Sequence, residues 1–239
     1  MKSILFRSKF SIIFFLSLSI GLSATAWKMQ QYKDKFQEIT DNQRWENILT
    51  ENHIYDDNSI VFFGDSQVSR WKMAPSFGLL PILNRGISGD WALKALKRFD
   101  SDVLKLKPKL LVLLIGTNDL EHGQSIDAIL DNIEIMLEKA HEKNIKVILC
   151  SLLPVTGKYI KGRPLNDILK INNNLKELSL KHAADYVDFH SQLINKEGKF
   201  IQDLTSDGLH PSRSGYLKMT KILFPYLIKN INTFFRYSN

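Results

Sequence analysis

From residue 59 onward the chain alternates between short apolar segments and longer amphipathic segments, with turn-forming residues between them. The clearest apolar segment covers residues 110–115 and reads Leu-Leu-Val-Leu-Leu-Ile. A continuous apolar run of this length is typical of a parallel strand that is buried on both faces. Strands that alternate with amphipathic helices favour a parallel α/β sheet, and we predict a three-layer αβα sandwich around a five-stranded parallel sheet.

The predicted elements follow from this alternation. The strands are expected at residues 59–63, 82–84, 109–115, 146–150 and 186–189, and the helices at residues 91–106, 125–143, 165–182 and 212–235. In a sheet of this kind, ligands bind in the crevice beyond the carboxyl ends of the strands. The residues that directly follow each strand are therefore the candidates for a functional site.

The first 26 residues have the pattern of an export signal. Lys2, Arg7 and Lys9 precede an uncharged stretch over residues 10–27, which contains the small-residue triplet Ala-Thr-Ala at residues 24–26. A basic start, an apolar centre and an A-x-A site together indicate a secretory signal peptide. The uncharged stretch also reaches the short end of the range that spans a bilayer, so an uncleaved N-terminal membrane anchor is the alternative.

Both alternatives place the rest of the chain outside the cytoplasm, either in the periplasmic or extracellular space or on the membrane through residues 10–27. Residues 27–55 are polar with sparse apolar residues at helical spacing, and we predict a helical stalk or a helix packed on the domain. Residues 56–239 then form the main domain. Cys150 is the only cysteine, which excludes an intramolecular disulfide, and its apolar neighbours indicate a buried strand position.

The net charge does not require a polyanionic partner. The chain carries 32 Lys and Arg against 25 Asp and Glu, and this formal charge of +7 by itself invites a nucleic-acid interpretation. Three of these cations belong to the leader, however, and the remaining excess is ordinary for a globular domain. We therefore predict no nucleic-acid partner.

Four polar segments follow predicted strands or precede the last predicted helix. They are Gly-Asp-Ser at residues 64–66, Arg-Gly-Ile-Ser-Gly-Asp at residues 85–90, Gly-Thr-Asn-Asp at residues 116–119 and Asp-Gly-Leu-His-Pro at residues 207–211. Each segment alone is compatible with an ordinary turn. Together they bring a serine, a glycine, an asparagine amide and an Asp-x-x-His pair to one edge of the sheet. Acyl transfer needs a nucleophile, oxyanion donors and a base held by a carboxylate.

These segments resemble the motifs of SGNH hydrolases of the GDSL-like lipase and esterase group, over residues 59–226. The residues that match the four named positions are Ser66, Gly89, Asn118 and His210. The segments are especially similar to the lysophospholipase-L1-like and platelet-activating-factor-acetylhydrolase-like branch. One departure is Gln67, which stands where the name-giving motif has leucine. The resemblance implies the flavodoxin-like version of the predicted sandwich and a carboxylic ester hydrolase.

The resemblance also implies a role for each of these residues. Ser66 Oγ would attack the ester carbonyl, and His210 would take its proton and later protonate the leaving alkoxide. Asp207, three residues before His210, would hold the imidazole across a turn. The oxyanion would be bound by the backbone N–H groups of Ser66 and Gly89 and by the side-chain amide of Asn118.

Other catalytic signatures are missing from the sequence. Val68 occupies the position where the G-x-S-x-G motif of α/β-hydrolases has its second glycine. The six histidines show neither H-E-x-x-H nor Cys/His metal spacing, so no metal and no cofactor are expected. Asp65 and Asp119 are predicted to fix the turn backbones through side-chain hydrogen bonds. Ser66 has an alternative role as a helix N-cap, and His210 as a packing or capping residue.

Four further residues are candidates for substrate binding. Trp71 and Trp91 each follow a motif and would wall the acyl or alcohol pocket, with packing under the loops as the alternative. Tyr159 and Arg163 belong to the basic loop at residues 157–164. This loop is either an ordinary solvated loop or one that recognises an anionic or carbohydrate substrate.

The predicted function is that of an exported serine esterase that removes small acyl groups, acetyl foremost, from a carbohydrate or a lipid-derived alcohol. The first alternative is a lysophospholipase or thioesterase with a longer acyl pocket, because the motifs do not encode pocket length. The second is a catalytically idle SGNH domain that binds the cell envelope. Its mark would be a lost Ser, Asn or His, and none is lost here. A small ester is the expected partner.

Overall fold

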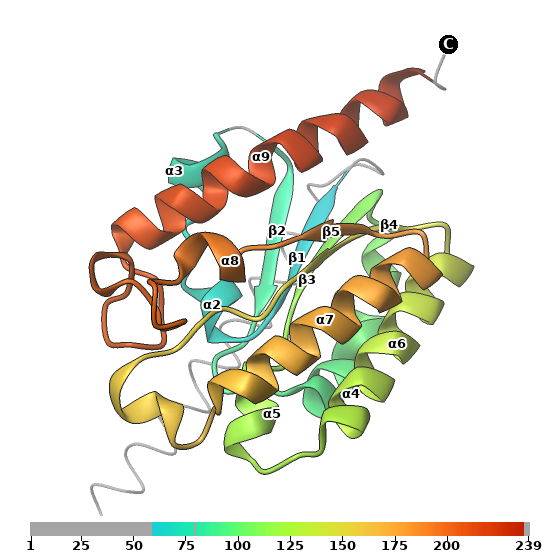
Figure 1. The fold of residues 1–239 in the computed structure, drawn as a ribbon. Helices are drawn as coiled ribbons and strands as arrows, with labels where there is room; N and C mark the ends of the chain where they lie inside the picture. Colours follow the sequence, from blue (N-terminus) through green and yellow to red (C-terminus); the bar gives the residue numbers. More distant parts are fainter. Residues whose placement is uncertain (1–58, 79, 237–239) are drawn as a thin grey trace, which may run out of the picture. The chain divides into compact units, whose positions relative to one another are not determined.

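The computed structural model describes residues 59–78 and 80–236, which contain a five-stranded parallel sheet (Figure 1). The strands are β1 (Ile60–Gly64), β2 (Ile82–Gly86), β3 (Leu110–Leu114), β4 (Lys146–Cys150) and β5 (Asp185–Val187), in the order β2-β1-β3-β4-β5. The chain runs outward from β1 to β2 and then crosses back to β3 on the other side of β1. The carboxyl ends of β1 and β3 therefore flank the topological switch point, where sheets of this kind bind ligands.

Helices cover both faces of the sheet, which confirms the predicted three-layer sandwich (Figure 1). One face packs against α4 (Ala92–Asp102), α6 (Ile126–Glu142) and α7 (Leu165–Lys181), and the other against α3 (Met73–Phe77) and α9 (Arg213–Arg236). Short helices α2 (Ser66–Ser69), α5 (Thr117–Glu121) and α8 (His190–Leu193) follow β1, β3 and β5. The 3-10 helices are η1 (Leu104–Leu106), η2 (Gly157–Ile160) and η3 (Gln202–Leu204).

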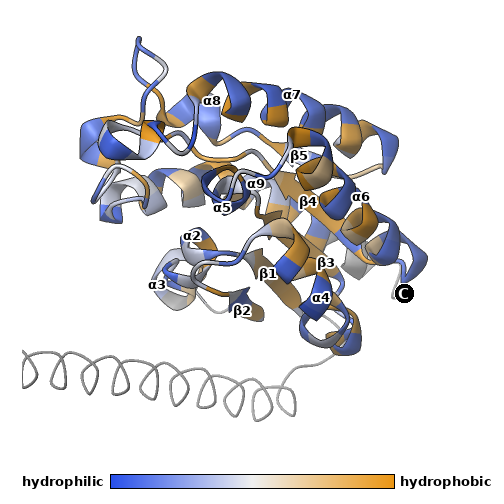
Figure 2. Cartoon of the chain, turned by 90° about the horizontal axis from the view of Figure 1, so that it is seen from below, coloured by the Kyte–Doolittle hydropathy of each residue, from blue (hydrophilic) through white to orange (hydrophobic). Residues whose placement is uncertain are grey.

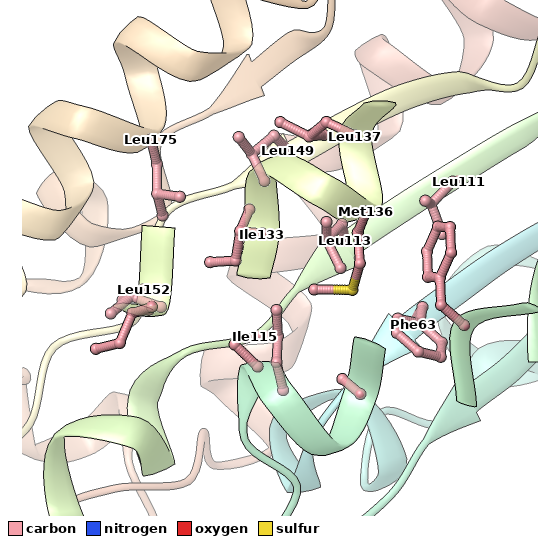
Figure 3. Packing of buried hydrophobic residues seen from close by; sticks show 14 of the residues in the cluster. Phe63, Leu111, Leu113, Ile115, Ile133, Met136, Leu137, Leu149, Leu152 and Leu175 are labelled. Carbon is pink, nitrogen blue, oxygen red and sulfur yellow. The ribbon is translucent and has the colours of Figure 1, made fainter. Parts of the chain in front are cut away.

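Successive strand residues point to opposite faces and divide the core into two clusters. Phe63 of β1 and Leu113 of β3 pack with Met136 of α6 (Figure 3). Phe62, the neighbour of Phe63, packs instead with Leu223 of α9. In Figure 2 the strands are mostly hydrophobic, whereas α6 and α7 carry hydrophilic residues on their outer faces. Burial of both strand faces explains why these strands read as continuous apolar runs.

The predicted helix over residues 91–106 is shorter in the structure. Helix α4 ends at Asp102, and the separate turn η1 follows it. Lys107 then adopts a left-handed conformation with φ of 48°, and Pro108 has no N–H group with which to continue a helix. The predicted limits of α6 and α9 differ from the observed ones by one residue at each end, and those of α7 by one residue at its C-terminal end.

The predicted leader at residues 1–26 and the predicted helix over residues 27–55 lie outside the described residues. All described elements belong to the compact unit that begins at Tyr55. Within the described part of the chain, no helix combines the length and the apolar character that a membrane crossing requires.

Candidate active site

Four turns meet at the carboxyl-end edge of the sheet. Ser66 is the first residue of α2, directly after β1, and Asn118 is the second residue of α5, directly after β3. Gly89 lies in the turn that follows β2, and residues 205–211 form the turn before α9. Because parallel strands all end on the same side, the topology alone brings the first three turns together.

Ser66, His210 and Asp207 form a continuous hydrogen-bonded chain. Ser66 Oγ lies 2.9 Å from His210 Nε2, and His210 Nδ1 lies 2.7 Å from Asp207 Oδ2. Because an ionised carboxylate only accepts hydrogen bonds, the imidazole proton resides on Nδ1, and Nε2 accepts from the Ser66 hydroxyl. Ser66 is 7% exposed and His210 is 8% exposed. The arrangement is that of a nucleophile, a base and a carboxylate that orients the base.

The turn from Asp207 to His210 is closed by the carboxylate that also holds the imidazole. Asp207 Oδ1 accepts hydrogen bonds from the backbone N–H groups of Leu209 and His210, at 2.9 and 2.8 Å. Burial by itself raises the pKa of Asp207, but the hydrogen bonds from the His210 backbone and ring and from Leu209 outweigh it and lower the pKa to about 2. Asp207 is therefore ionised at neutral pH and can stabilise an imidazolium.

Asp65, and not Ser66, is the N-cap of α2. Its Oδ1 accepts a hydrogen bond of 2.8 Å from Gln67 N, which confirms the predicted turn-fixing role. The N-cap alternative for Ser66 is therefore wrong, since the Ser66 hydroxyl bonds to His210 instead. Complete burial raises the pKa of Asp65 to about 7 in spite of the Gln67 hydrogen bond.

Gly89 presents an open stretch of backbone at this edge. Its φ of +80° is a left-handed conformation that residues other than glycine rarely adopt. Apart from Gly89 itself and its two chain neighbours, no residue has an atom within 4 Å of the position that a Cβ would take, so a ligand can approach this backbone closely. The turn is closed by a hydrogen bond of 3.2 Å from Asp90 N to Ile87 O. Such exposure is what a backbone oxyanion donor needs.

Asn118 is oriented by two opposite hydrogen bonds. Its Nδ2 donates to Asp90 O at 2.8 Å, and its Oδ1 accepts from Nη2 of Arg163 at 3.1 Å. The first bond attaches the amide to the residue that follows Gly89. The turn after β2 and the turn after β3, which hold the predicted oxyanion donors Gly89 and Asn118, are therefore directly connected.

Asp119 makes a second connection between the same two turns. Both of its carboxylate oxygens accept from the backbone N–H of Ala92 at the start of α4, at 3.0 and 2.9 Å. Burial raises the pKa of Asp119, although the Ala92 hydrogen bond opposes this shift. The predicted turn-fixing role of Asp119 is confirmed.

Two of the four predicted substrate-binding residues are buried in the protein. Trp71 is 2% exposed, and its indole Nε1 donates to Thr220 Oγ1 at 3.2 Å. The prediction that Trp71 walls a pocket is wrong, and its packing alternative is confirmed. Arg163 is 4% exposed, and its guanidinium binds Thr117 O and the side chains of Asn118 and Glu121, so it does not reach out to a substrate.

Trp91 and Tyr159 keep part of their surface exposed. The Trp91 ring lies edge-on to the His122 ring, with centroids 3.9 Å apart. The Tyr159 ring packs against the guanidinium of Arg163, at 5.6 Å from its centroid. Their assignment to substrate binding stays a prediction.

Arg98 links α4 to the ends of β1 and β2 and to the turn after β2, and the sequence pattern does not reveal this role. Its guanidinium binds the carboxylates of Asp90 and Asp102, each at 2.6 Å. It also donates to Arg85 O at 3.0 Å and to Gly64 O at 3.1 Å, at the ends of β2 and β1. In the sequence Arg98 reads as one more exposed cation of an amphipathic helix. The only signals are two acidic residues eight before and four after it, and neither spacing is specific.

Other reactive groups of the described residues make none of the hydrogen bonds described above. Glu134, Glu138 and His182 bring possible metal-ligand atoms within 4.8 Å of one another on α6 and at the end of α7. Glu134 already accepts from Lys181 Nζ at 2.6 Å and lies 2.9 Å from His182 Nε2. Cys150 is buried at the end of β4, and this burial raises the pKa of its thiol far above the usual range.

Comparison with known proteins identifies the relatives of this arrangement. Residues 58–218 match the model of the GDSL-like lipase/acylhydrolase family. Platelet-activating factor acetylhydrolase IB subunit alpha2 from Homo sapiens is 29% identical over 187 residues, which cover 71% of this chain and 76% of that protein. The crystal structure of a GDSL-like lipase from Bacteroides thetaiotaomicron superposes with a TM-score of 0.71 at 26% identity, over 77% of this chain and 97% of that one. The lipase/acylhydrolase from Enterococcus faecalis, 23% identical over 71% of this chain and 95% of its own, shares the fold with a TM-score of 0.62.

Proposed function

The chain belongs to the GDSL-like lipase/acylhydrolase family of SGNH hydrolases and is a carboxylic ester hydrolase, and on that premise we propose that Ser66, His210 and Asp207 carry its reaction. The substrate we propose is a small acyl ester, with acetyl foremost, of a carbohydrate or a lipid-derived alcohol. The observation that carries the proposal is the hydrogen-bonded chain from Ser66 through His210 to Asp207.

In the first half of the reaction, His210 Nε2 accepts the hydroxyl proton while Ser66 Oγ attacks the carbonyl carbon. The tetrahedral oxyanion receives hydrogen bonds from the N–H groups of Ser66 and Gly89 and from Nδ2 of Asn118. The imidazolium, stabilised by Asp207, then protonates the leaving alkoxide, and the acyl group stays on Ser66. In the second half, water gives a proton to His210 and attacks the acyl carbon. The imidazolium then returns this proton to Ser66 Oγ as the bond between Oγ and the acyl carbon breaks, which releases the carboxylic acid and restores Ser66.

The hydrogen-bonded chain constrains the acyl group of the substrate less than it constrains the mechanism. The human relative carries the name of an acetylhydrolase, which supports acetyl as the acyl group. The alternative is a lysophospholipase or thioesterase that prefers a longer acyl chain. The residues of the hydrogen-bonded chain serve either substrate equally, because the attack and the proton transfers do not depend on acyl length.

A chain-length series on the full-length chain tests this proposal. We expect the highest kcat/KM on the two-carbon member of a series of p-nitrophenyl esters, and a loss of at least about 10³-fold in Ser66→Ala. Ser69→Ala, in the same helix, is the matched control and should keep wild-type activity. Preference for the longest esters would overturn the acetyl proposal and keep the mechanism. Undiminished hydrolysis by Ser66→Ala would overturn the mechanism.

We also propose that the chain is exported, because its first 26 residues combine a basic start, an apolar stretch and an A-x-A site. The protein would then act in the periplasmic or extracellular space, or on the membrane through residues 10–27 if the leader is kept. Mass spectrometry of the N-terminus of the native protein distinguishes these forms. A chain that begins at Trp27 supports cleavage, an intact leader in the membrane fraction supports anchoring, and an intact leader in the cytosol contradicts export.

A further inference from the structure

We propose that Arg163 is the positioning residue of the oxyanion amide: its buried guanidinium holds Asn118 Oδ1, and thereby turns Asn118 Nδ2 toward the reacting oxygen. The inference rests on the proposed function, in which Asn118 Nδ2 binds the oxyanion. It replaces the role that the sequence suggests for Arg163, which is direct contact with the substrate.

The contacts of Arg163 are directed at the start of α5. Its Nε donates to Thr117 O at 3.1 Å, and its Nη2 donates to Asn118 Oδ1 at 3.1 Å. Its Nη1 forms an ion pair with Glu121 at the end of the same helix. Arg163 itself is 4% exposed, so a fixed, planar donor lies behind the Asn118 amide.

The two hydrogen-bond partners of the Asn118 amide determine where its oxygen and its NH₂ group lie. Arginine can only donate a hydrogen bond, and the backbone oxygen of Asp90 can only accept one. A half-turn of the amide would place its NH₂ group against the guanidinium and its oxygen against Asp90 O, and both contacts would be repulsive. In the observed orientation one N–H of Nδ2 goes to Asp90 O. The other is available to an oxyanion, whereas the rotated amide would offer its oxygen.

The charge of Arg163 acts in the same direction as its geometry. A guanidinium bonded to Oδ1 draws electron density toward that oxygen and polarises the N–H bonds at the other end of the amide. A polarised N–H is a stronger donor to a developing negative charge. Arg163 thus supports the oxyanion through Asn118 without touching the substrate.

Glu121 pairs with this guanidinium, and Gly162 leaves the space for that pair. A Cβ at residue 162 would overlap the Glu121 carboxylate, so the absence of a side chain lets Glu121 reach Arg163. The Glu121 side chain is 51% exposed and is free to swing into solvent if it is displaced. Gly162→Ala therefore removes the carboxylate from Arg163 while the bonds to Thr117 and Asn118 remain.

The loop that carries Arg163 also contacts the turn that carries the base. Thr156 N donates to Gly208 O at 2.8 Å, two residues before His210. One segment between β4 and α7 therefore contacts both the oxyanion side and the base side of the site. Because this contact is structural, a substitution of Arg163 can lower activity through the position of Asn118 or through general loss of support for the fold. The experiment separates these two causes.

The experiment is a double-mutant cycle on the full-length chain with p-nitrophenyl acetate. We expect Asn118→Ala to lower kcat by about 10² to 10³, as for loss of one oxyanion donor. Arg163→Met should lower kcat by about 10- to 100-fold with KM changed less than about threefold, because a misaligned donor acts on the transition state. In the Asn118→Ala background, Arg163→Met should add less than about threefold, because the residue acts through Asn118.

Three further variants complete the experiment. Arg163→Lys should recover part of kcat, since one donor replaces the planar fork. The same variant keeps the inference testable if Arg163→Met does not fold. Gly162→Ala displaces only the Glu121 carboxylate and leaves the bond from Arg163 to Asn118, so it should keep kcat within about threefold of wild type. Lys170→Met removes an exposed charge on α7 and should leave kcat unchanged.

The outcomes separate this inference from the proposed function. Wild-type kcat in Asn118→Ala overturns the oxyanion role of Asn118, and this inference with it. A loss in Asn118→Ala with wild-type kcat in Arg163→Met, or in Arg163→Lys should Arg163→Met not fold, keeps the proposed function and overturns the role of Arg163. An equal loss from Arg163→Met in both backgrounds assigns Arg163 to the fold alone and also overturns it.

Discussion

At the scale of single residues, Asp207 performs two tasks with one carboxylate. Oδ1 closes the turn to His210 through two backbone N–H groups, and Oδ2 holds the imidazole. The i, i+3 spacing of the two residues is readable from the sequence, and so is the pairing it suggests. The lowered pKa of Asp207, about 2, depends on contacts that only the fold creates.

Asp207→Asn should lower kcat by about 10² to 10⁴, because an amide N–H facing Nδ1 moves the imidazole proton to Nε2, where it blocks acceptance from Ser66. Since the pKa of Asp207 is about 2, its titration should not contribute to the wild-type pH profile of kcat/KM between pH 4 and 7. The acid limb of this profile should therefore correspond to a single proton. Steady-state kinetics across this range check both statements. A wild-type rate in Asp207→Asn, or an acid limb steeper than one proton, would contradict the assignment.

For the buried Asp65 carboxyl we predict an effect on stability and not on the reaction rate. Its pKa is raised to about 7 by burial, so between about pH 4 and 7 the unfolded chain loses this proton while the folded chain keeps it. The wild-type free energy of unfolding should therefore fall, relative to Asp65→Asn, by up to about 1.4 kcal/mol per pH unit in this window. Above about pH 7 the difference should be constant.

Urea unfolding of both forms at several pH values measures this difference. The amide that Asp65→Asn introduces keeps an oxygen for Gln67 N, so the N-cap of α2 survives the substitution, and groups common to both forms cancel. Stability curves that run parallel from pH 4 to 8 would show that Asp65 is ionised in the folded state at every pH tested.

At the scale of elements, α4 supports the site through Arg98. The guanidinium lies over the Phe63 ring at 4.1 Å and binds two carboxylates that are almost fully buried, those of Asp90 and Asp102. Two acidic groups without their cation would be costly, because breaking a buried ion pair leaves a charge without compensation. The end of α4 is therefore held by electrostatics as well as by apolar packing.

Arg98→Met should lower the free energy of unfolding by about 3 to 5 kcal/mol, because it strands two buried carboxylates. Lys97→Met, the exposed neighbour, is the control and should change stability by less than about 0.5 kcal/mol. Chemical denaturation compares the two variants. Equal stability of Arg98→Met and Lys97→Met would rule out the role of Arg98 that the contacts indicate.

The length and the apolar pattern of each element determine whether the sequence predicts it. The strands are readable as short apolar runs, and the long helices α6, α7 and α9 are readable because their apolar spacing repeats over many residues. Helices α2 and α5 have four and five residues, too few for a periodic signal, and they form because tertiary contacts fix them. The sequence places Arg163 against the substrate because nothing in its neighbourhood names Asn118, 45 residues earlier, as its partner.

At the scale of the whole molecule, the strand order decides where chemistry can occur. Placing β1 between β2 and β3 puts the residues after these three strands next to one another, and Ser66, Gly89 and Asn118 are among them. The order itself is expected only through the resemblance to SGNH hydrolases, because apolar runs do not tell which strands are neighbours. The turn from Asp207 to His210 then joins the same edge through the bond to Ser66.

The most direct test of the account is covalent trapping of Ser66. A fluorophosphonate loses fluoride when a serine Oγ that has given up its proton attacks phosphorus, so the label marks an activated nucleophile. With the full-length chain, intact-mass and peptide mass spectrometry should find a single adduct, on Ser66, which is absent from Ser66→Ala and strongly slowed in His210→Ala. Ester hydrolysis without any adduct at Ser66, or labelling of Ser66 at the same rate without His210, would contradict the central claim.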